Sequence, residues 1–295
     1  MKHIRSRTSI LARASILPLL LAGAAQAQTV NPVALTLHND QGLSLRAFQY
    51  STGSVGAPRK AVVLMHGCAG VYSNSLPNDS YTNVQTIYRD WASKLANTGY
   101  VVLLVDSFSG RTDPATGLAV PQNQCGNGSA GVSEVNDRPL DALAAYHYLA
   151  GNATLNVDAQ RVALVGWSHG ASSVMATLAA SQASRPFRAG LAFYPGCGLY
   201  NAFGGLSNST YTPYAPFKIL HADLDPLYTG GACQTRRDRS WILGGVQFQV
   251  IDHFAGAAHS FDGCKAVSGS CTSADVAAKT TADAVALNFL TDSLK

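Results

Sequence analysis

Short apolar segments alternate with helical segments along most of this chain of 295 residues. Continuous apolar runs separated by helices are typical of strands that are buried on both faces of a parallel sheet. The pattern therefore predicts an α/β fold with a mostly parallel, doubly wound sheet and helices on both of its faces. Strands are expected at residues 61–65, 100–105, 161–165, 190–194, 217–220 and 246–251. Helices are expected at residues 84–98, 138–150, 171–182 and 273–294.

Two further stretches lie outside this alternation. Residues 35–37 and 43–50 predict an antiparallel hairpin at the edge of the sheet. Residues 107–132 are polar and rich in Gly, Asn and Pro, which indicates an excursion over the surface. Because the chain shows neither an internal repeat nor a linker, we expect one domain at residues 28–295.

The first 27 residues have the features of a secretory signal peptide. Basic residues precede an apolar run at residues 16–24, which leads into the small-residue cleavage site Ala25-Gln26-Ala27. The apolar run is too short to span a bilayer. We therefore expect residues 1–27 to be removed and the protein to be exported to the periplasm or the medium, without a membrane anchor.

The formal charge of +4 belongs to this leader. Removing the leader lowers Lys+Arg from 21 to 17, which equals the 17 Asp+Glu. The remaining chain has no excess of positive charge, so neither nucleic acid nor an anionic membrane is an expected partner.

All six cysteines follow the leader, and an even number in an exported chain predicts disulfides. Six cysteines allow 15 pairings, which the sequence alone does not decide. Cys264 and Cys271 are close enough to close a small loop. The other four follow expected strand ends, and we expect the pairs Cys68–Cys125 and Cys197–Cys233. No CxxC or HxxxH spacing occurs, so a metal site is not expected.

Gly166-Trp167-Ser168-His169-Gly170 follows an expected strand and precedes an expected helix. A GxSxG motif occurs by chance in Gly- and Ser-rich chains, but a strand–turn–helix context is typical of a nucleophilic serine on a tight turn. Such a serine requires an acid and a histidine after two later strands, in that order. Asp225 and His259 meet this requirement, and Asp223 is the alternative acid. Asp225 is favoured because Pro226 constrains the turn at that position.

Acyl transfer also requires two backbone N–H groups that stabilise an oxyanion. One belongs to the residue after the nucleophile, which is His169. The other is expected in the loop His66-Gly67-Cys68-Ala69-Gly70, where the N–H of Cys68 is the favoured donor.

Four motifs together resemble the dienelactone hydrolase family of α/β-hydrolases over residues 61–290. They are GWSHGA with Arg138, Asp141 and Ala142 on the preceding helix, the HGCAG loop, HADLDP and GAAHSF. The resemblance implies an α/β-hydrolase fold with Ser168 as nucleophile, Asp225 as acid and His259 as base. Cytoplasmic members carry a cysteine nucleophile and a glutamate in the early loop, whereas this chain has Ser168 and a single glutamate, Glu134. This chain is more similar to the exported members of the family, which carry a serine nucleophile.

We therefore expect a secreted serine hydrolase that cleaves a small-molecule ester or lactone through an acyl-enzyme, without a cofactor. The alternatives are a peptidase or polyester depolymerase with the same triad, or a catalytically silent binding protein of this fold. Structural roles are favoured for the strand-end histidines and the motif tryptophan. Solvated surface positions are favoured for the arginines, with binding of a substrate carboxylate as the alternative for Arg111. Tyrosines at the pocket mouth are a further possibility. The residues with expected structural roles are His66, His221 and Trp167. The arginines are Arg111, Arg236, Arg237 and Arg239, and the tyrosines are Tyr72, Tyr81 and Tyr228.

Overall fold

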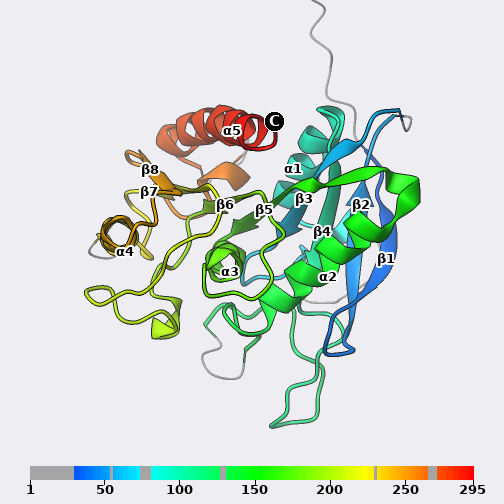
Figure 1. The fold of residues 1–295 in the computed structure, drawn as a ribbon, viewed down its shortest axis with the longest axis horizontal. Helices are drawn as coiled ribbons and strands as arrows, with labels where there is room; N and C mark the ends of the chain where they lie inside the picture. The colour runs from blue at the N-terminus through cyan, green and yellow to red at the C-terminus, as the bar shows by residue number, and fades with distance from the viewer. Residues whose placement is uncertain (1–29, 54–55, 74–80, 127–130, 229–230, 265–270) are drawn as a thin grey trace, which may run out of the picture.

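The computed structural model describes residues 30–53, 56–73, 81–126, 131–228, 231–264 and 271–295. The expected signal peptide at residues 1–27 lies outside these residues. Eight strands form one sheet in the order β1-β2-β4-β3-β5-β6-β7-β8 (Figure 1). The strands are β1 (Val33–His38), β2 (Ser44–Tyr50), β3 (Arg59–Met65), β4 (Val101–Asp106), β5 (Val157–Trp167), β6 (Ala189–Phe193), β7 (Phe217–Ala222) and β8 (Phe248–Phe254). The principal helices are α1 (Thr86–Asn97), α2 (Arg138–Gly151), α3 (His169–Leu178), α4 (Ala232–Ile242) and α5 (Ser273–Ser293).

The sheet is parallel from β4 to β8 and antiparallel at its first edge. β1 pairs with β2, and β2 with β4, in antiparallel register. The pairs β3–β4, β3–β5, β5–β6, β6–β7 and β7–β8 are parallel. Both the predicted mostly parallel sheet and the predicted edge hairpin are confirmed.

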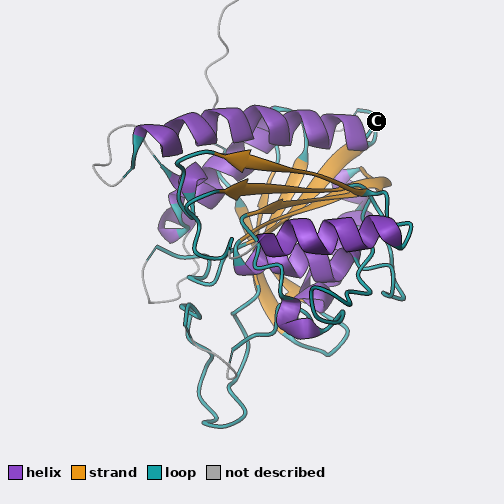
Figure 2. Cartoon of the chain, turned by 90° about the vertical axis from the view of Figure 1, so that its left-hand side faces the viewer, coloured by secondary structure: helices purple, strands orange, loops and turns teal. Residues whose placement is uncertain are grey.

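Helices cover both faces of the sheet, as Figure 2 shows from the side. Strand β3 explains this arrangement, because alternate residues belong to different cores. Val62 and Leu64 pack in the core beneath α1 and α5, whereas Val63 and Met65 pack in the core beneath α2, α3 and α4. A strand that is apolar on both faces therefore requires a helical layer on each side.

Local sequence features explain the formation of α1 and α5. In α1 the buried residues recur at helical spacing, from Tyr88 through Trp91 and Ala92 to Leu95 and Ala96. Helix α5 begins with a capping box, in which the Thr272 side chain accepts from the Asp275 N–H and the Asp275 carboxylate accepts from the Thr272 N–H.

Helix α4 was not expected from the sequence. Its buried residues include Cys233, Arg236 and Ser240, so its inner face is polar rather than an apolar stripe. Arg236 is fully buried, and its guanidinium donates to the carbonyl oxygens of Cys197 and Gly198. The prediction of a solvated arginine face is therefore wrong for Arg236.

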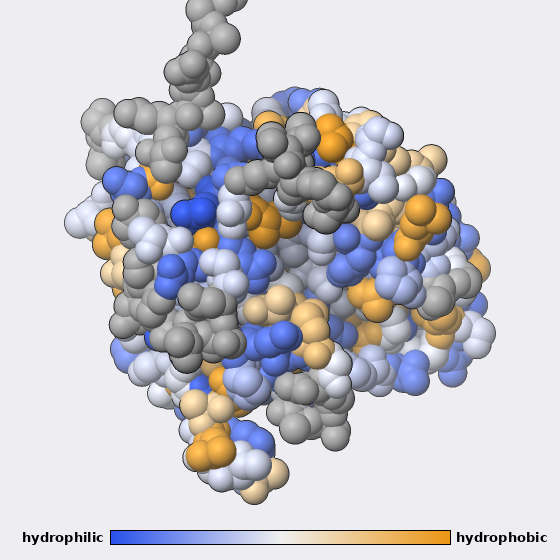
Figure 3. All heavy atoms as spheres, turned by 180° about the vertical axis from the view of Figure 1, so that it is seen from behind, coloured by the Kyte–Doolittle hydropathy of each residue, from blue (hydrophilic) through white to orange (hydrophobic). Residues whose placement is uncertain are grey.

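All three expected disulfides are present: Cys68–Cys125, Cys197–Cys233 and Cys264–Cys271. They close loops with sequence separations of 57, 36 and 7 residues. None of the helices in the described ranges is both long and apolar enough to cross a bilayer. On the face that Figure 3 shows, hydrophobic residues are scattered among hydrophilic ones.

Candidate active site

Ser168 occupies the turn between β5 and α3 in a conformation that few non-glycine residues adopt. Its φ of 50° and ψ of −117° lie outside the helical and strand regions. Its N–H donates to the carbonyl oxygen of Phe193 at 2.9 Å, which fixes the turn against β6. Ser168 is buried and lines a pocket. This is the geometry of a nucleophile elbow.

The glycines on either side of Ser168 are required by close backbone contacts. A Cβ on Gly166 would lie 2.3 Å from the Gly170 carbonyl oxygen, and a Cβ on Gly170 would lie 2.1 Å from that of Met65. Both distances are too short for real atoms, and the neighbours are backbone. The sequence motif therefore reflects packing of the elbow against β3 as well as chemistry.

Gly170→Ala is accordingly expected to destabilise the protein by about 3 kcal/mol or more, since only a backbone shift relieves the overlap. Gly151→Ala is the matched control, because a Cβ there meets nothing within 4 Å and the residue ends α2 in a helical conformation. That change should be neutral or stabilising by about 0.5 kcal/mol. Denaturant unfolding of both variants checks the difference, and equal stabilities would contradict the packing argument.

His259 and Asp225 are joined by a short hydrogen bond. His259 Nδ1 lies 2.7 Å from Asp225 Oδ2, and because a carboxylate accepts, Nδ1 carries the proton. Nε2 of the neutral ring is then the acceptor nitrogen. Asp225 is buried, and its other oxygen accepts from the Leu227 N–H at 2.8 Å. Its position is therefore held by the turn after β7.

Asp223 makes a different contact. It is exposed, and its Oδ1 accepts from the Gly256 N–H at 2.7 Å. The structure therefore brings Asp225 and not Asp223 to the imidazole of His259.

Ser168 and His259 line the same pocket, which has a volume of about 620 Å³. Gly67, Cys68 and Ala69 of the loop after β3 also line it. Three loops that are far apart in sequence thus meet at the carboxyl ends of the parallel strands, where α/β sheets place ligands. The Tyr194 ring packs against the His259 ring, with centroids 4.5 Å apart.

Two backbone N–H groups are available beside Ser168. His169 is the first residue of α3, where helical N–H groups have no partner within the helix. Within the described part of the chain, neither this N–H nor that of Cys68 has a hydrogen-bond acceptor. Two contacts hold the loop after β3 that contains Cys68. They are the disulfide to Cys125 and the hydrogen bond from the Gln124 N–H to the Cys68 carbonyl oxygen at 2.7 Å.

Buried polar groups support the elbow from the side of α2. Arg138 is fully buried and donates to the His66 carbonyl and to His169 Nδ1, both at 2.8 Å. Burial, and then the charge of Arg138, lowers the pKa of His169 to about 3, which keeps its ring neutral. Burial raises the pKa of Glu134 to about 7. Its Oε2 lies 3.9 Å from His169 Nε2.

His66 is a structural histidine, as predicted. Its Nε2 accepts from the Ser107 N–H at 3.1 Å, so its Nδ1 carries the proton and donates to the Gly67 carbonyl at 2.8 Å. Burial lowers its pKa well below the usual range. The ring thus ties the loop after β3 to the loop after β4.

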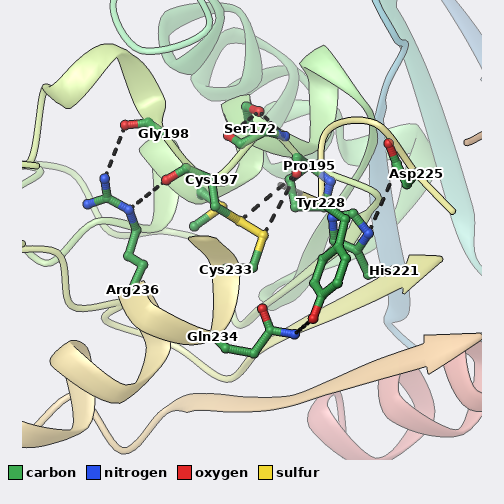
Figure 4. The surroundings of a disulfide bond; sticks show 12 residues. Ser172, Pro195, Cys197, Gly198, His221, Asp225, Tyr228, Cys233, Gln234 and Arg236 are labelled. Carbon is green, nitrogen blue, oxygen red and sulfur yellow. Dashed lines mark hydrogen bonds and ion pairs between the residues drawn. A yellow bond between two sulfur atoms is a disulfide. The ribbon is translucent and has the colours of Figure 1, made fainter. Parts of the chain in front are cut away.

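Behind Asp225 lies a second group of polar residues, shown in Figure 4. His221 is buried, with Nδ1 3.7 Å from Asp225 Oδ2 and its ring against Tyr228. Gln234 of α4 donates to the Tyr228 hydroxyl at 2.7 Å. The Cys197–Cys233 disulfide anchors α4 beside this group. His221 is therefore part of the packing behind the acid, as its expected structural role requires.

The sequence analysis missed Asp262, which is fully buried beneath the site. It accepts hydrogen bonds from Trp91 Nε1 at 3.0 Å, Trp167 Nε1 at 2.7 Å and the Tyr194 hydroxyl at 2.7 Å. Burial raises its pKa, and these bonds oppose the rise. In the sequence, only its position three residues after His259 indicated that Asp262 could belong to the site.

Arg111 is not a solvated surface residue, so that prediction is wrong. Its Nη2 lies 2.7 and 2.8 Å from the two oxygens of the buried Asp141. The alternative role, binding of a substrate carboxylate, is not supported either, because the guanidinium is already paired. Trp167 is packed and also lines the pocket, and Tyr72 lines it as well. Tyr228 is not among the lining residues, and the Tyr81 side chain lies outside what the structure describes.

No group of three or more His, Cys, Asp or Glu residues in the described ranges is arranged to hold a metal ion. The sheet topology, the elbow and the histidine–carboxylate pair together define an α/β-hydrolase fold. The model of the dienelactone hydrolase family matches residues 46–294. The chain belongs to this family.

Solved structures with this fold include several esterases. A dienelactone hydrolase-like promiscuous phosphotriesterase from metagenomic libraries aligns with a TM-score of 0.62 and 18% identity, covering 90% of this chain and 100% of that one. Esterase 2 of Thermogutta terrifontis, phosphorylated by paraoxon, aligns with a TM-score of 0.59 and 14% identity, covering 88% of this chain and 95% of that one. An esterase of Pyrococcus furiosus aligns with a TM-score of 0.56 and 16% identity, covering 89% of this chain and 93% of that one. No curated protein sequence matches significantly.

Proposed function

We propose that this protein is an exported serine esterase that cleaves carboxylic ester or lactone bonds through a Ser168–His259–Asp225 triad. The observation that carries the proposal is the 2.7 Å bond between His259 Nδ1 and Asp225 Oδ2, in a pocket that Ser168 also lines. Membership of a hydrolase family and the esterases among its structural neighbours support the same chemistry.

The proposed reaction begins with attack of Ser168 Oγ on the ester carbonyl. His259 Nε2 takes the hydroxyl proton, and Asp225 stabilises the imidazolium that forms. The N–H groups of Cys68 and His169 stabilise the oxyanion of the tetrahedral intermediate. The imidazolium then protonates the leaving alcohol, and a water molecule repeats the sequence on the acyl-enzyme, which releases the acid and regenerates Ser168.

Export is supported by two independent features. Residues 1–27 contain a basic, an apolar and a small-residue segment in the order typical of a signal peptide. All six cysteines are paired in disulfides, which persist in oxidising compartments.

Covalent labelling tests the nucleophile directly. A fluorophosphonate should add to Ser168 alone, and the fraction labelled should equal the fraction of 4-nitrophenyl ester hydrolysis that is lost. Intact-protein and peptide mass spectrometry locate the adduct. No adduct would favour a catalytically silent binding protein, and an adduct elsewhere would exclude this triad. Faster cleavage of peptide anilides than of esters would make the protein a peptidase.

A further inference from the structure

We propose that the pocket selects uncharged esters that carry an aromatic ring and discriminates against esters that carry a carboxylate. The inference rests on the esterase function proposed above and specifies its substrate class. Three observations carry it: the charge of the lining residues, the carboxyl groups behind the pocket wall, and the orientation of the aromatic donors in that wall.

The described residues that line the pocket include no lysine, arginine, aspartate or glutamate. Its polar side chains carry amide and hydroxyl groups and the His259 ring; the side-chain amides are those of Gln85, Gln122 and Asn123. A carboxylate that entered this pocket would lose hydration without gaining a cation as partner. An uncharged substrate avoids this cost.

Two buried carboxyl groups contact the pocket wall from behind. Asp225 is bonded to His259, and Asp262 is bonded to Trp167 and Tyr194. Neither group offers a positive partner to a ligand carboxylate, and a carboxylate at either position opposes the approach of a second negative charge.

Arg138 and Arg111 do not offset these carboxyl groups for a ligand, and Arg89, whose Nη2 lies 3.3 Å from the Thr86 hydroxyl, is not among the lining residues. Arg138 is fully buried and donates to His66 and His169, and Arg111 is paired with Asp141. Neither arginine is among the lining residues.

The Trp167 and Tyr194 rings in the wall present carbon rather than hydrogen-bond donors. The Trp167 N–H and the Tyr194 O–H both donate to Asp262, so neither is available to a ligand. The Tyr88 ring packs edge-on against Trp167, with centroids 5.4 Å apart, and its hydroxyl accepts from the Gly67 N–H. Aromatic rings pack well against such a surface. A volume of about 620 Å³ accommodates a substituted ring together with its ester group.

Matched esters test the charge preference. 4-Acetoxybenzamide and 4-acetoxybenzoate differ by a carboxamide in place of a carboxylate and release the same acyl group. We expect kcat/KM, divided by the hydroxide rate constant of each ester, to be about 10-fold or more higher for the benzamide. Equal values, or a preference for the benzoate, would overturn the inference while leaving the esterase function intact.

Binding to the Ser168→Ala variant separates the two proposals. Titrations followed by tryptophan fluorescence should give tighter binding of 4-acetoxybenzamide than of 4-acetoxybenzoate. Benzamide should bind about three-fold to ten-fold more tightly than cyclohexanecarboxamide, which has similar size but no aromatic ring. If the wild-type protein hydrolyses neither these esters nor a 4-nitrophenyl ester, the esterase proposal fails, and these affinities alone decide whether the pocket has the stated preference. Equal affinities in both pairs would overturn it.

A new cation at the pocket rim should weaken the preference for the uncharged ester. Thr86 lines the pocket at the start of α1, so Thr86→Lys should raise the benzoate-to-benzamide ratio of kcat/KM at least three-fold at low salt. Thr280→Lys places the same charge on an exposed position of α5 and should leave the ratio unchanged. An unchanged ratio in Thr86→Lys would contradict the electrostatic basis of the inference.

Discussion

Replacing Ser168 with alanine is expected to lower kcat for a 4-nitrophenyl ester by about 10⁴-fold or more. Ser168 is the only group in the proposed reaction that forms a covalent bond to the substrate, so its loss removes the acyl-enzyme route entirely. The residual rate reflects stabilisation by the Cys68 and His169 N–H groups, which the substitution leaves in place. Alanine is as constrained as serine at the φ of 50°, so the fold should be retained.

Ser184→Ala is the matched control, because Ser184 is exposed and lies outside the lined pocket. Steady-state kinetics and thermal unfolding of both variants, purified in the same way, give the result. Turnover by Ser168→Ala within ten-fold of the wild-type rate would show that another group carries the reaction.

Asp225→Asn is expected to lower kcat by about 10³-fold to 10⁴-fold with little change in KM. An amide in place of Oδ2 favours the wrong tautomer of His259 and leaves the imidazolium without its negative partner. The effect falls on the transition state rather than on substrate binding, because Asp225 does not line the pocket.

Asp223→Asn provides the comparison that the structure suggests. Asp223 follows the same strand but is exposed and bonded to the Gly256 N–H, so its substitution should change kcat less than about three-fold. Comparable losses in both variants would mean that the acid has been assigned to the wrong aspartate.

Much of the fold could be predicted because its determinants are local. β3 and β4 contain continuous apolar runs, and β7 contains an apolar run that Lys218 interrupts; the ends of all three strands lie within two residues of the prediction. The strand prediction of 161–165 was too short, since β5 begins at Val157 with partly exposed residues that form no continuous apolar run. Helix α4 was missed because its inner face is formed by an arginine and a disulfide, which no hydrophobic period reveals.

The candidate site was likewise predicted in part from the sequence. Ser168, Asp225 and His259 could be selected from the sequence, because an elbow is a local motif and the order of its partners follows from the topology of a parallel sheet. Pro226 and the family resemblance favoured Asp225 over Asp223, but only the short contact of Asp225 with His259 distinguishes the two geometrically.

Asp262, Arg236 and Arg111 show what only the tertiary structure decided. Each is a charged residue whose partners come from distant segments: Trp91 and Trp167 for Asp262, the Cys197–Gly198 backbone for Arg236, and Asp141 for Arg111. Residue type alone placed the two arginines at the surface, where charged side chains usually lie. Burial of a charge requires partners in three dimensions, whereas apolar periodicity and turn motifs act between neighbours in the chain. The sequence by itself therefore determined the order of the elements and the positions of the triad candidates, and the tertiary structure decided which polar groups are buried around them.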